Sequence, residues 1–320
     1  MADPIKWRSK IILCKPEPLN AYGVDPTPTG AANALLLTDV TLQPMEGQEV
    51  SRNLERPYLG SQEQLPVGLY SVFTGSFELV GSGTLGVAPA WGPLLRACAV
   101  AQVITPDTVP GDGKVEYTPI SDNHESVAIH FWIGPNRYVI LGGRATAEFS
   151  LSALGIPMCR VTVTGMFTVP AEAARPTVDL SHFQVPQVAS KTATPIFTID
   201  DIPFVLRDFR LTLGNDIQQR ILIPTERIII VDKDEQISAT VEAVPMSLYN
   251  PVLRATAPAP RQNITLQHGS IAGRIVTIEA DQAVQKRFAG SQENQRIEEW
   301  PLTFATLPTA GDDQWKITLT

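Results

Sequence analysis

Short stretches in which apolar and polar residues alternate recur along the chain. In residues 71–79, Phe73 and Phe77 fall on one side of an extended backbone and polar residues on the other. Residues 144–151 and 160–164 alternate in the same way. A period of two is typical of strands with one buried face, and such one-sided burial is typical of antiparallel sheets. The pattern therefore predicts a mainly β protein.

Helix signals are few. The 27 prolines and 22 glycines are spread along the chain, which favours turns and leaves little room for long helices. Residues 90–99 predict one short helix, with Pro93 tolerated in its first turn. A second short helix is predicted around residues 250–255.

The two predicted helices belong to an internal repeat. Residues 93–97 (PLLRA) match residues 251–255 (PVLRA), and the preceding residues 74–80 align with residues 238–244. Periodic self-similarity is the mark of repeated structural units. We therefore predict two copies of one domain.

A third, weaker match lies further upstream. Residues 37–42 resemble residues 207–213, so three matches occur in the same order. The distance between matched segments decreases along the chain, which indicates that the first repeat carries the longer connections.

These features predict four parts. Residues 1–30 are Pro-rich and predict an extended N-terminal arm without a core of its own. Residues 31–176 form the first domain and residues 191–320 the second. Residues 177–190 form the linker, in a small, polar and Pro-bearing region of the kind found between domains.

A long polar excursion interrupts the first repeat at residues 46–64. Long loops in compact domains are usually functional or disordered. This one carries apolar and cationic anchors, so we expect it to dock on a neighbouring subunit. A mobile hairpin tip is the alternative. The expected anchors are Val50, Leu54, Arg56, Tyr58 and Leu59.

Composition argues against several classes of function. The net charge is −8, whereas a protein that binds DNA tightly presents a basic face to the phosphates. The apolar runs are too short to span a bilayer, and the first residues lack the apolar core of a signal peptide. Three distant cysteines argue against both a disulfide framework and a CxxC metal site. These features fit synthesis in a reducing cytoplasm.

One nucleotide-binding motif occurs, but in the wrong context. Residues 81–86 read GSGTLG, a literal GxGxxG. A dinucleotide site needs a helix that begins within the motif, so that its N-terminus faces the pyrophosphate. Pro89 and Pro93 prevent this, and we interpret the motif as a flexible turn.

No other residues point to catalysis. None of the four histidines lies at metal-ligand spacing, and neither a Gly-x-Ser-x-Gly elbow nor a phosphate-binding loop is present. Asp200-Asp201 and Asp312-Asp313 lie beside proline or glycine, where aspartate is a turn former. We therefore expect a protein that is not an enzyme and has no metal or cofactor.

Three segments resemble a known family. Residues 22–34, 56–60 and 90–98 are similar, in this order, to segments of the major tail tube proteins of long, non-contractile tailed phages (siphophages). The likeness covers residues 22–170, and the second repeat resembles the family mainly through its match to the first. The signatures are descriptive and are less specific than a catalytic motif.

The resemblance implies a β-sandwich domain with a flanking helix. Six such domains form a ring, and the rings stack into a hollow tube whose inner wall is one continuous β-barrel. Members with two tube domains in one chain form trimers with pseudo-sixfold symmetry, and the duplication seen here is similar to that arrangement. The expected function is a conduit for DNA ejection.

The resemblance also implies partners and a location. The chain would associate with itself, with the tape measure protein and DNA in the lumen, and with tail terminator and distal tail proteins at the ends of the tube. DNA contact would be non-specific, and no membrane would be involved. The protein would be assembled in the host bacterial cytoplasm and reside in the virion tail.

The repeat and the alternation predict which residues line the lumen. Glu78 and Glu242 occupy matching positions on the polar face, and Phe77 and Val241 point to the core instead. An acidic or neutral lumen lets DNA slide, because stable phosphate contacts come from Lys and Arg. The other expected lumen residues are Thr74, Ser76, Ser238 and Thr240, with Glu148 and Asp39 as weaker candidates.

Two alternatives remain open at this point. A distal tail or tail-completion protein of related fold would form single rings and never filaments. A carbohydrate-binding β-sandwich would need an exposed aromatic cluster, for which Trp132, Tyr138 and Trp300 are the candidates.

Overall fold

The computed structural model describes residues 4–320 and is mainly β, as the alternation predicts. Its strands pair antiparallel, in one extended hydrogen-bonded network and one separate two-stranded ribbon, β14–β15. Three short helices accompany them: α1 (Gly30–Asn33), α2 (Gly92–Arg96) and α3 (Pro251–Arg254). The helices α2 and α3 lie where the sequence predicts them.

The strands up to the linker region are β1 (Lys10–Pro16), β2 (Ala34–Leu35), β3 (Thr38–Ser51), β4 (Gln64–Glu78), β5 (Val100–Thr105), β6 (Lys114–Pro119), β7 (Val127–Ile133), β8 (Asn136–Ser152), β9 (Met158–Met166) and β10 (Ala171–Glu172). Those after it are β11 (Ile196–Ile199), β12 (Ile202–Pro203), β13 (Leu206–Thr212), β14 (Asn215–Leu222), β15 (Thr225–Lys233), β16 (Gln236–Glu242), β17 (Arg261–His268), β18 (Val276–Gln285), β19 (Gln292–Asn294), β20 (Ile297–Thr306) and β21 (Lys316–Leu319).

Strand pairing repeats along the chain. In the first half the order of pairing is β1–β7–β8–β9–β4–β3. In the second half it is β11–β17–β18–β20–β16–β13. We call these the first and second arrays. Each also has a short helix between the strands β4 and β7, or β16 and β17.

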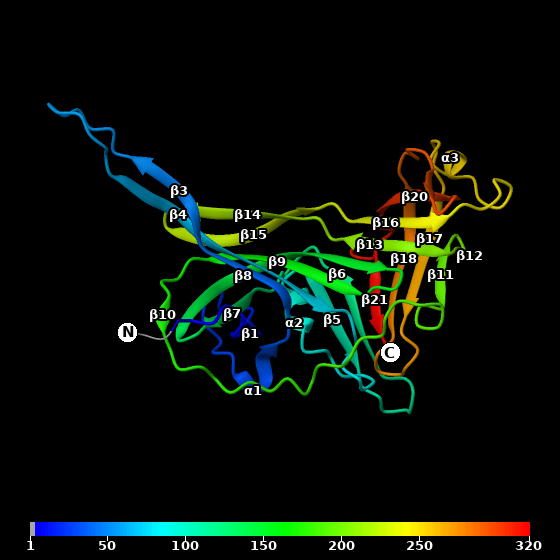
Figure 1. Cartoon of the computed structure of the whole chain (residues 1–320), viewed down its shortest axis with the longest axis horizontal. Helices are drawn as coiled ribbons and strands as arrows, with labels where there is room; N and C mark the ends of the chain where they lie inside the picture. Colours follow the sequence, from blue (N-terminus) through cyan, green and yellow to red (C-terminus); the bar gives the residue numbers. More distant parts are fainter. Residues whose placement is uncertain (1–3) are drawn as a thin grey trace.

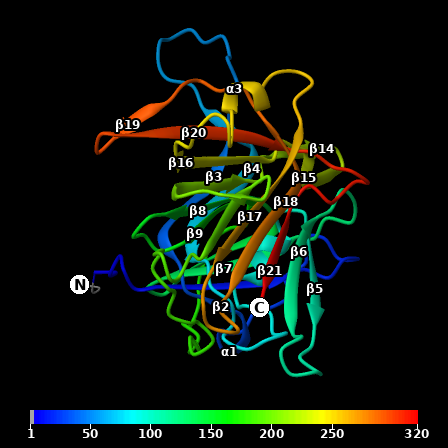
Figure 2. The ribbon, with the colours of Figure 1, turned by 90° about the vertical axis from the view of Figure 1, so that its right-hand side faces the viewer.

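One strand of each array changes partners midway. The first part of β8 pairs with β7 and its second part with β9, with register shifts near Gly142. Ile140 and Ala145 are both buried, so the buried side changes across this bulge, which adds a residue and turns the strand. In β18, the change falls between Ala280 and Ala283. The strands β16 and β20 consequently cross the direction of β17 and β18 (Figure 2).

Two strand pairings join the arrays. The strand β13 pairs with the end of β8, from Asp208 opposite Ser152 to Thr212 opposite Glu148. The strand β21 pairs with β6, where Ile317 lies opposite Tyr117. A single hydrophobic core runs across both junctions.

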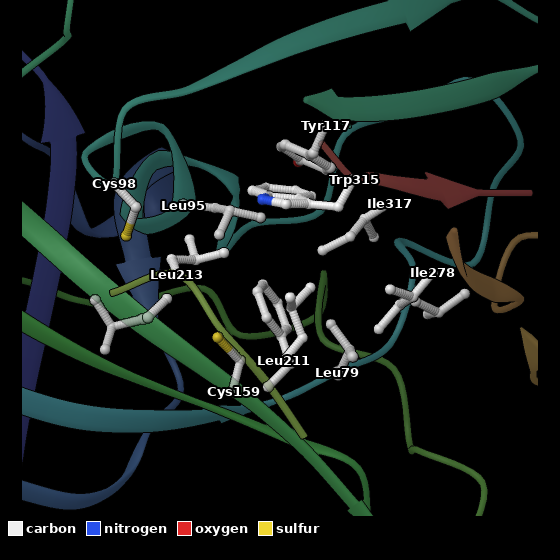
Figure 3. Packing of buried hydrophobic residues seen from close by; sticks show 14 of the residues in the cluster. Leu79, Leu95, Cys98, Tyr117, Cys159, Leu211, Leu213, Ile278, Trp315 and Ile317 are labelled. Atoms are coloured by element: carbon white, nitrogen blue, oxygen red, sulfur yellow. The ribbon is translucent and has the colours of Figure 1, made fainter. Parts of the chain in front are cut away.

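Figure 3 shows this shared core. Leu95 and Cys98, at α2 in the first array, lie close to Leu213 and Trp315 from the second array. All four side chains are buried, so each array completes the core of the other.

Each array carries a long hairpin. The strands β3 and β4 form one that projects from an end of the molecule, with residues 52–63 at its tip (Figure 1). The corresponding hairpin of the second array starts as β13 and β16 and continues as the ribbon β14–β15, which lies along the first array.

Two details differ from the sequence prediction. Residues 10–16 of the expected arm form β1, which pairs with β7 and buries Leu13 and Cys14, so this segment belongs to the first array. Part of the expected excursion at residues 46–64 is strand: residues 46–51 end β3 and Gln64 begins β4, whereas residues 52–63 form the tip. The predicted linker, residues 177–190, contains neither helix nor strand.

Candidate functional site: a polar sheet face

Strands from both arrays form one continuous sheet. Its order is β3–β4–β9–β8–β13–β16–β20–β18, which gives eight strands, four from each array. We call this the wall sheet. The β8–β13 pairing is the step at which the sheet passes from one array to the other.

One face of the wall sheet packs on the core and the other is polar. Along β16, Ile237, Ala239 and Val241 are buried and the residues between them are only half-buried. The same alternation holds in β8 and β13. Most members of the opposite face, here called the polar face, are serine or threonine. They include Thr74, Ser76, Glu78, Thr146, Glu148, Ser150, Arg160, Thr162, Asp208, Arg210, Thr212, Ser238, Thr240, Glu242 and Thr303.

The register places the matched residues at corresponding positions. Thr74 lies between Thr41 of β3 and Thr162 of β9, and the Oγ1 atoms of Thr74 and Thr162 are 3.4 Å apart. Ser238 lies in the same way between Arg210 of β13 and Thr303 of β20.

The next matched pair occupies corresponding positions as well. Ser76 lies opposite Arg160, and Thr240 lies opposite Pro301. The four hydroxyl residues singled out in the sequence thus lie on one face of one sheet.

The two matched glutamates end their strands. Glu78 is the last residue of β4, opposite Met158, and Glu242 is the last residue of β16, opposite Glu299. Their preceding residues, Phe77 and Val241, are buried, as the alternation predicts.

An ion pair between buried Glu299 and half-buried Arg207 lies beside Glu242. The Arg207 guanidinium donates to Glu299, with its Nε 2.6 Å from Oε1 and 2.8 Å from Oε2. These hydrogen bonds from Arg207 lower the pKa of the Glu299 carboxyl. Because Arg207 compensates the charge of Glu299, this pair adds no net charge to the polar face.

Glu148 lies at the junction between the arrays. The Nη1 of Arg210 is 3.3 Å from its Oε1, and both side chains are partly exposed. Exposed pairs of this kind contribute little to stability, typically below about 1 kcal/mol. Asp39 lies in a bulge between Thr38 and Thr41 with φ of 51°, and it is exposed there, so the register does not assign it to a face.

Sequence reasoning missed the two arginines of the polar face, Arg160 and Arg210. Both lie in segments whose alternation marks the polar side, residues 160–164 and 207–213. That signal was sufficient to find them. They make the face mixed in charge, with serine and threonine around the charged groups.

The five expected docking residues lie on the projecting hairpin. Val50, Leu54, Arg56, Tyr58 and Leu59 are all exposed. Two sets of contacts lie within the tip. Arg52 Nη1 is 3.3 Å from Glu63 Oε2. The side-chain amide of Gln62 accepts a hydrogen bond from the Leu54 N–H and donates one to the Leu54 carbonyl oxygen.

Other candidate chemistry finds no support within residues 4–320. These residues hold no cluster of three or more potential metal ligands. Over the same range, no helix is both long and apolar enough to cross a membrane. The segment 81–86 is a loop that precedes α2 by several residues. All three cysteines are buried, and burial raises the pKa of each thiol.

The three candidate aromatic residues do not form an exposed sugar-binding cluster. Trp132 and Trp300 are buried, and Tyr138 is half-buried against Phe131. A carbohydrate-binding platform needs aromatic rings that are exposed side by side, so these three residues do not support the carbohydrate-binding alternative.

No protein-family model matches the chain, and a search of curated proteins found no match. The polar face and the strand order therefore carry the functional argument.

Proposed function

We propose that the chain is the structural unit of a hollow tube, a major tail tube protein of the siphophage type, in which each array acts as one tube domain. The observation that carries the proposal is the wall sheet. It combines four strands from each array, is buried on one side and polar on the other, and has an unpaired outer edge at β3 within residues 4–320.

Open edges need a partner. A long exposed edge strand is a template for pairing with another chain, and closure into a barrel removes it. β3 pairs with β4 alone among residues 4–320, so its outer edge is free. The β8–β13 pairing shows that one array can continue the sheet of another.

The size of such a ring suits DNA. Three chains with eight wall strands each give roughly 24 strands, and a spacing of about 4.8 Å gives a circumference of about 115 Å. The backbone diameter is then about 37 Å, larger with strand tilt. Side chains narrow this opening but leave room for a double helix.

The chemistry of the polar face suits passage of DNA. Strong phosphate binding requires clusters of Lys and Arg. Arg210 is paired with Glu148, and the surrounding residues are mostly hydroxylic or acidic. DNA would meet a hydrated surface that does not hold it, as a conduit requires.

Electron microscopy of concentrated, purified protein tests this function. The proposal predicts hollow filaments of uniform width. Single rings at all concentrations would favour the distal tail or tail-completion alternative. A protein that stays monomeric at all concentrations would contradict the proposal.

A further inference from the structure

Each array has a surface beside its short helix, α2 or α3. Within residues 4–320, a hairpin of the same chain covers the surface beside α2 but not the one beside α3. We propose that the outer part of the β3–β4 hairpin of one copy docks beside α3 of a second copy, repeating the contact that β14–β15 makes beside α2 within the chain. This inference rests on the proposed function and specifies the interface that would build the tube.

The internal contact is well defined. The Asn215 side chain at the start of β14 donates from Nδ2 to the carbonyl oxygens of Cys98, 2.7 Å away, and Ala145, 2.8 Å away. Lys233, at the end of β15, donates to the carbonyl oxygen of Ile120 at 2.6 Å. The base of this hairpin is therefore attached to the backbone that follows α2.

The two hairpins differ in burial. On β15, Ile228 is 1% exposed and Ile230 is 8% exposed, because the hairpin lies on the first array. On β4, Leu65 and Val67 have the same spacing but are 44% and 40% exposed. The outer part of the projecting hairpin, next to its tip, thus offers apolar residues that remain exposed.

The helices α2 and α3 also differ in burial. In α2, Leu94 and Leu95 are at most 1% exposed, and Leu95 lies close to Leu213 and Trp315 of the second array. At the matched positions of α3, Val252 and Leu253 are 56% and 67% exposed. Val252 and Leu253 are thus exposed at positions where the first array buries its apolar residues. Exposed apolar patches mark interaction sites, so we expect a partner to cover this one.

The sheet edge beside α3 is also incomplete. In the first array, β13 pairs with the last five residues of β8. The strand β18 ends at Gln285, and the following residues 286–291 form no strand, although Lys286 still donates its N–H to the Thr303 carbonyl. An incoming β3 would pair with this segment, as β13 pairs with β8.

The occupant must be another copy. The β3–β4 hairpin projects at one end of the molecule and α3 lies at the opposite end (Figure 1). A hairpin therefore cannot reach the α3 of its own chain. An interface between two different surfaces of identical chains is heterologous, and it closes into a ring when the rotation allows.

Cysteine cross-linking tests the contact directly. Glu46, in the β3 bulge, corresponds to the start of β14, and Thr256 follows α3 as Cys98 follows α2. The native cysteines are buried and should not interfere. Glu46→Cys and Thr256→Cys chains, mixed and assembled under oxidation, should yield disulfide-linked dimers. Neither variant alone should do so, nor should Glu46→Cys mixed with Val109→Cys, a control in the β5–β6 turn.

A charge substitution provides a second readout. Leu253→Glu should leave a folded monomer whose assembly is abolished or requires at least tenfold more protein. Val109→Glu, at another exposed apolar position, should assemble like the wild type. Tubes of the mixed Glu46→Cys and Thr256→Cys chains that carry no cross-link, or Leu253→Glu tubes at wild-type concentration, would overturn this contact but leave the proposed function intact. Wild-type protein that forms no tube would instead overturn the proposed function.

Discussion

Asn215 shows how a single polar residue holds the two arrays together. Its side chain is buried and satisfies two carbonyl oxygens of the first array, and its backbone N–H donates to Thr146 Oγ1 at 3.2 Å. Asn215→Ala leaves both carbonyls without this donor, which should lower the free energy of unfolding by about 1–3 kcal/mol. Urea denaturation of the monomer measures the loss. Gln218→Ala, at an exposed position on the same ribbon, should change it by less than about 0.5 kcal/mol.

Buried histidines make stability depend on pH. Burial lowers the pKa of His124, His130 and His268, although Asp25, 3.0 Å from His130, partly opposes this. Near and below pH 6.5 the unfolded chain therefore binds more protons than the folded chain, and the free energy of unfolding falls as pH falls. Burial raises the pKa of Glu235, so this group makes the free energy of unfolding fall as pH rises. We expect the three histidines together to outweigh this single carboxyl group.

Thermal unfolding of the monomer between pH 5.5 and pH 7.5 tests this balance. We expect the melting temperature to rise with pH over this range. His268→Gln should reduce the slope, whereas substitution of the exposed His182 should not. A melting temperature that is flat or falls with pH would show that the histidines do not control acid stability.

The polar face can be made adhesive to DNA. Thr74→Lys combined with Ser238→Lys places a cation at corresponding points of both arrays without touching the core. Tubes should still form, and tubes assembled with DNA should retain nuclease-protected DNA that high salt releases. Wild-type tubes should retain much less. Equal retention by both would show that these residues do not line the lumen.

At the scale of elements, the sequence predicted strands and helices better than their partners. The alternation around Phe73 and Phe149 predicted β4 and part of β8. It could not predict that β13 pairs with β8, because a period of two fixes the buried side of a strand and not its neighbour. The role of β1 was missed for a related reason: the prolines around it obscured a short strand that pairs with β2 and β7.

The same distinction holds for the candidate site: the sequence predicted the buried and polar sides of its strands but not their irregularities. Matching segments and alternation predicted equivalent lumen-facing positions for Glu78 and Glu242, with Phe77 and Val241 in the core. Phe77 and Val241 are buried and both glutamates end paired strands, while the lumen-facing position stays a prediction. The bulge that leaves Asp39 unassigned is invisible in the sequence, since any residue pattern can accommodate an extra residue at a strand end.

The tip of the β3–β4 hairpin is an element that the fold does not need. Residues 52–63 lie beyond both strands and contact only their own hairpin among the side-chain hydrogen bonds described. Replacing residues 53–62 by a two-residue Asn-Gly turn should therefore leave a folded, soluble monomer with an unchanged melting temperature. It should assemble poorly, because Leu54, Tyr58 and Leu59 are lost. Assembly at the normal rate, followed by light scattering, would show that the tip is not a docking element.

At the scale of the whole molecule, the two arrays form a unit that is asymmetric by construction. The first array alone carries the β5–β6 hairpin, which pairs with β21, and the two long hairpins differ in length. Contacts within the chain and between chains would therefore be similar but not identical. A ring of three such units, as proposed, would have true threefold symmetry and only approximate sixfold symmetry.

Averaged cross-sections of assembled tubes, imaged by cryo-electron microscopy, test this account most directly. Three chains per ring should appear as six similar lobes around a hollow centre, with rotational symmetry that is threefold at high detail. Six chains per ring, with only one array of each chain at the inner wall, would contradict it, because the wall sheet could not then be continuous across both arrays.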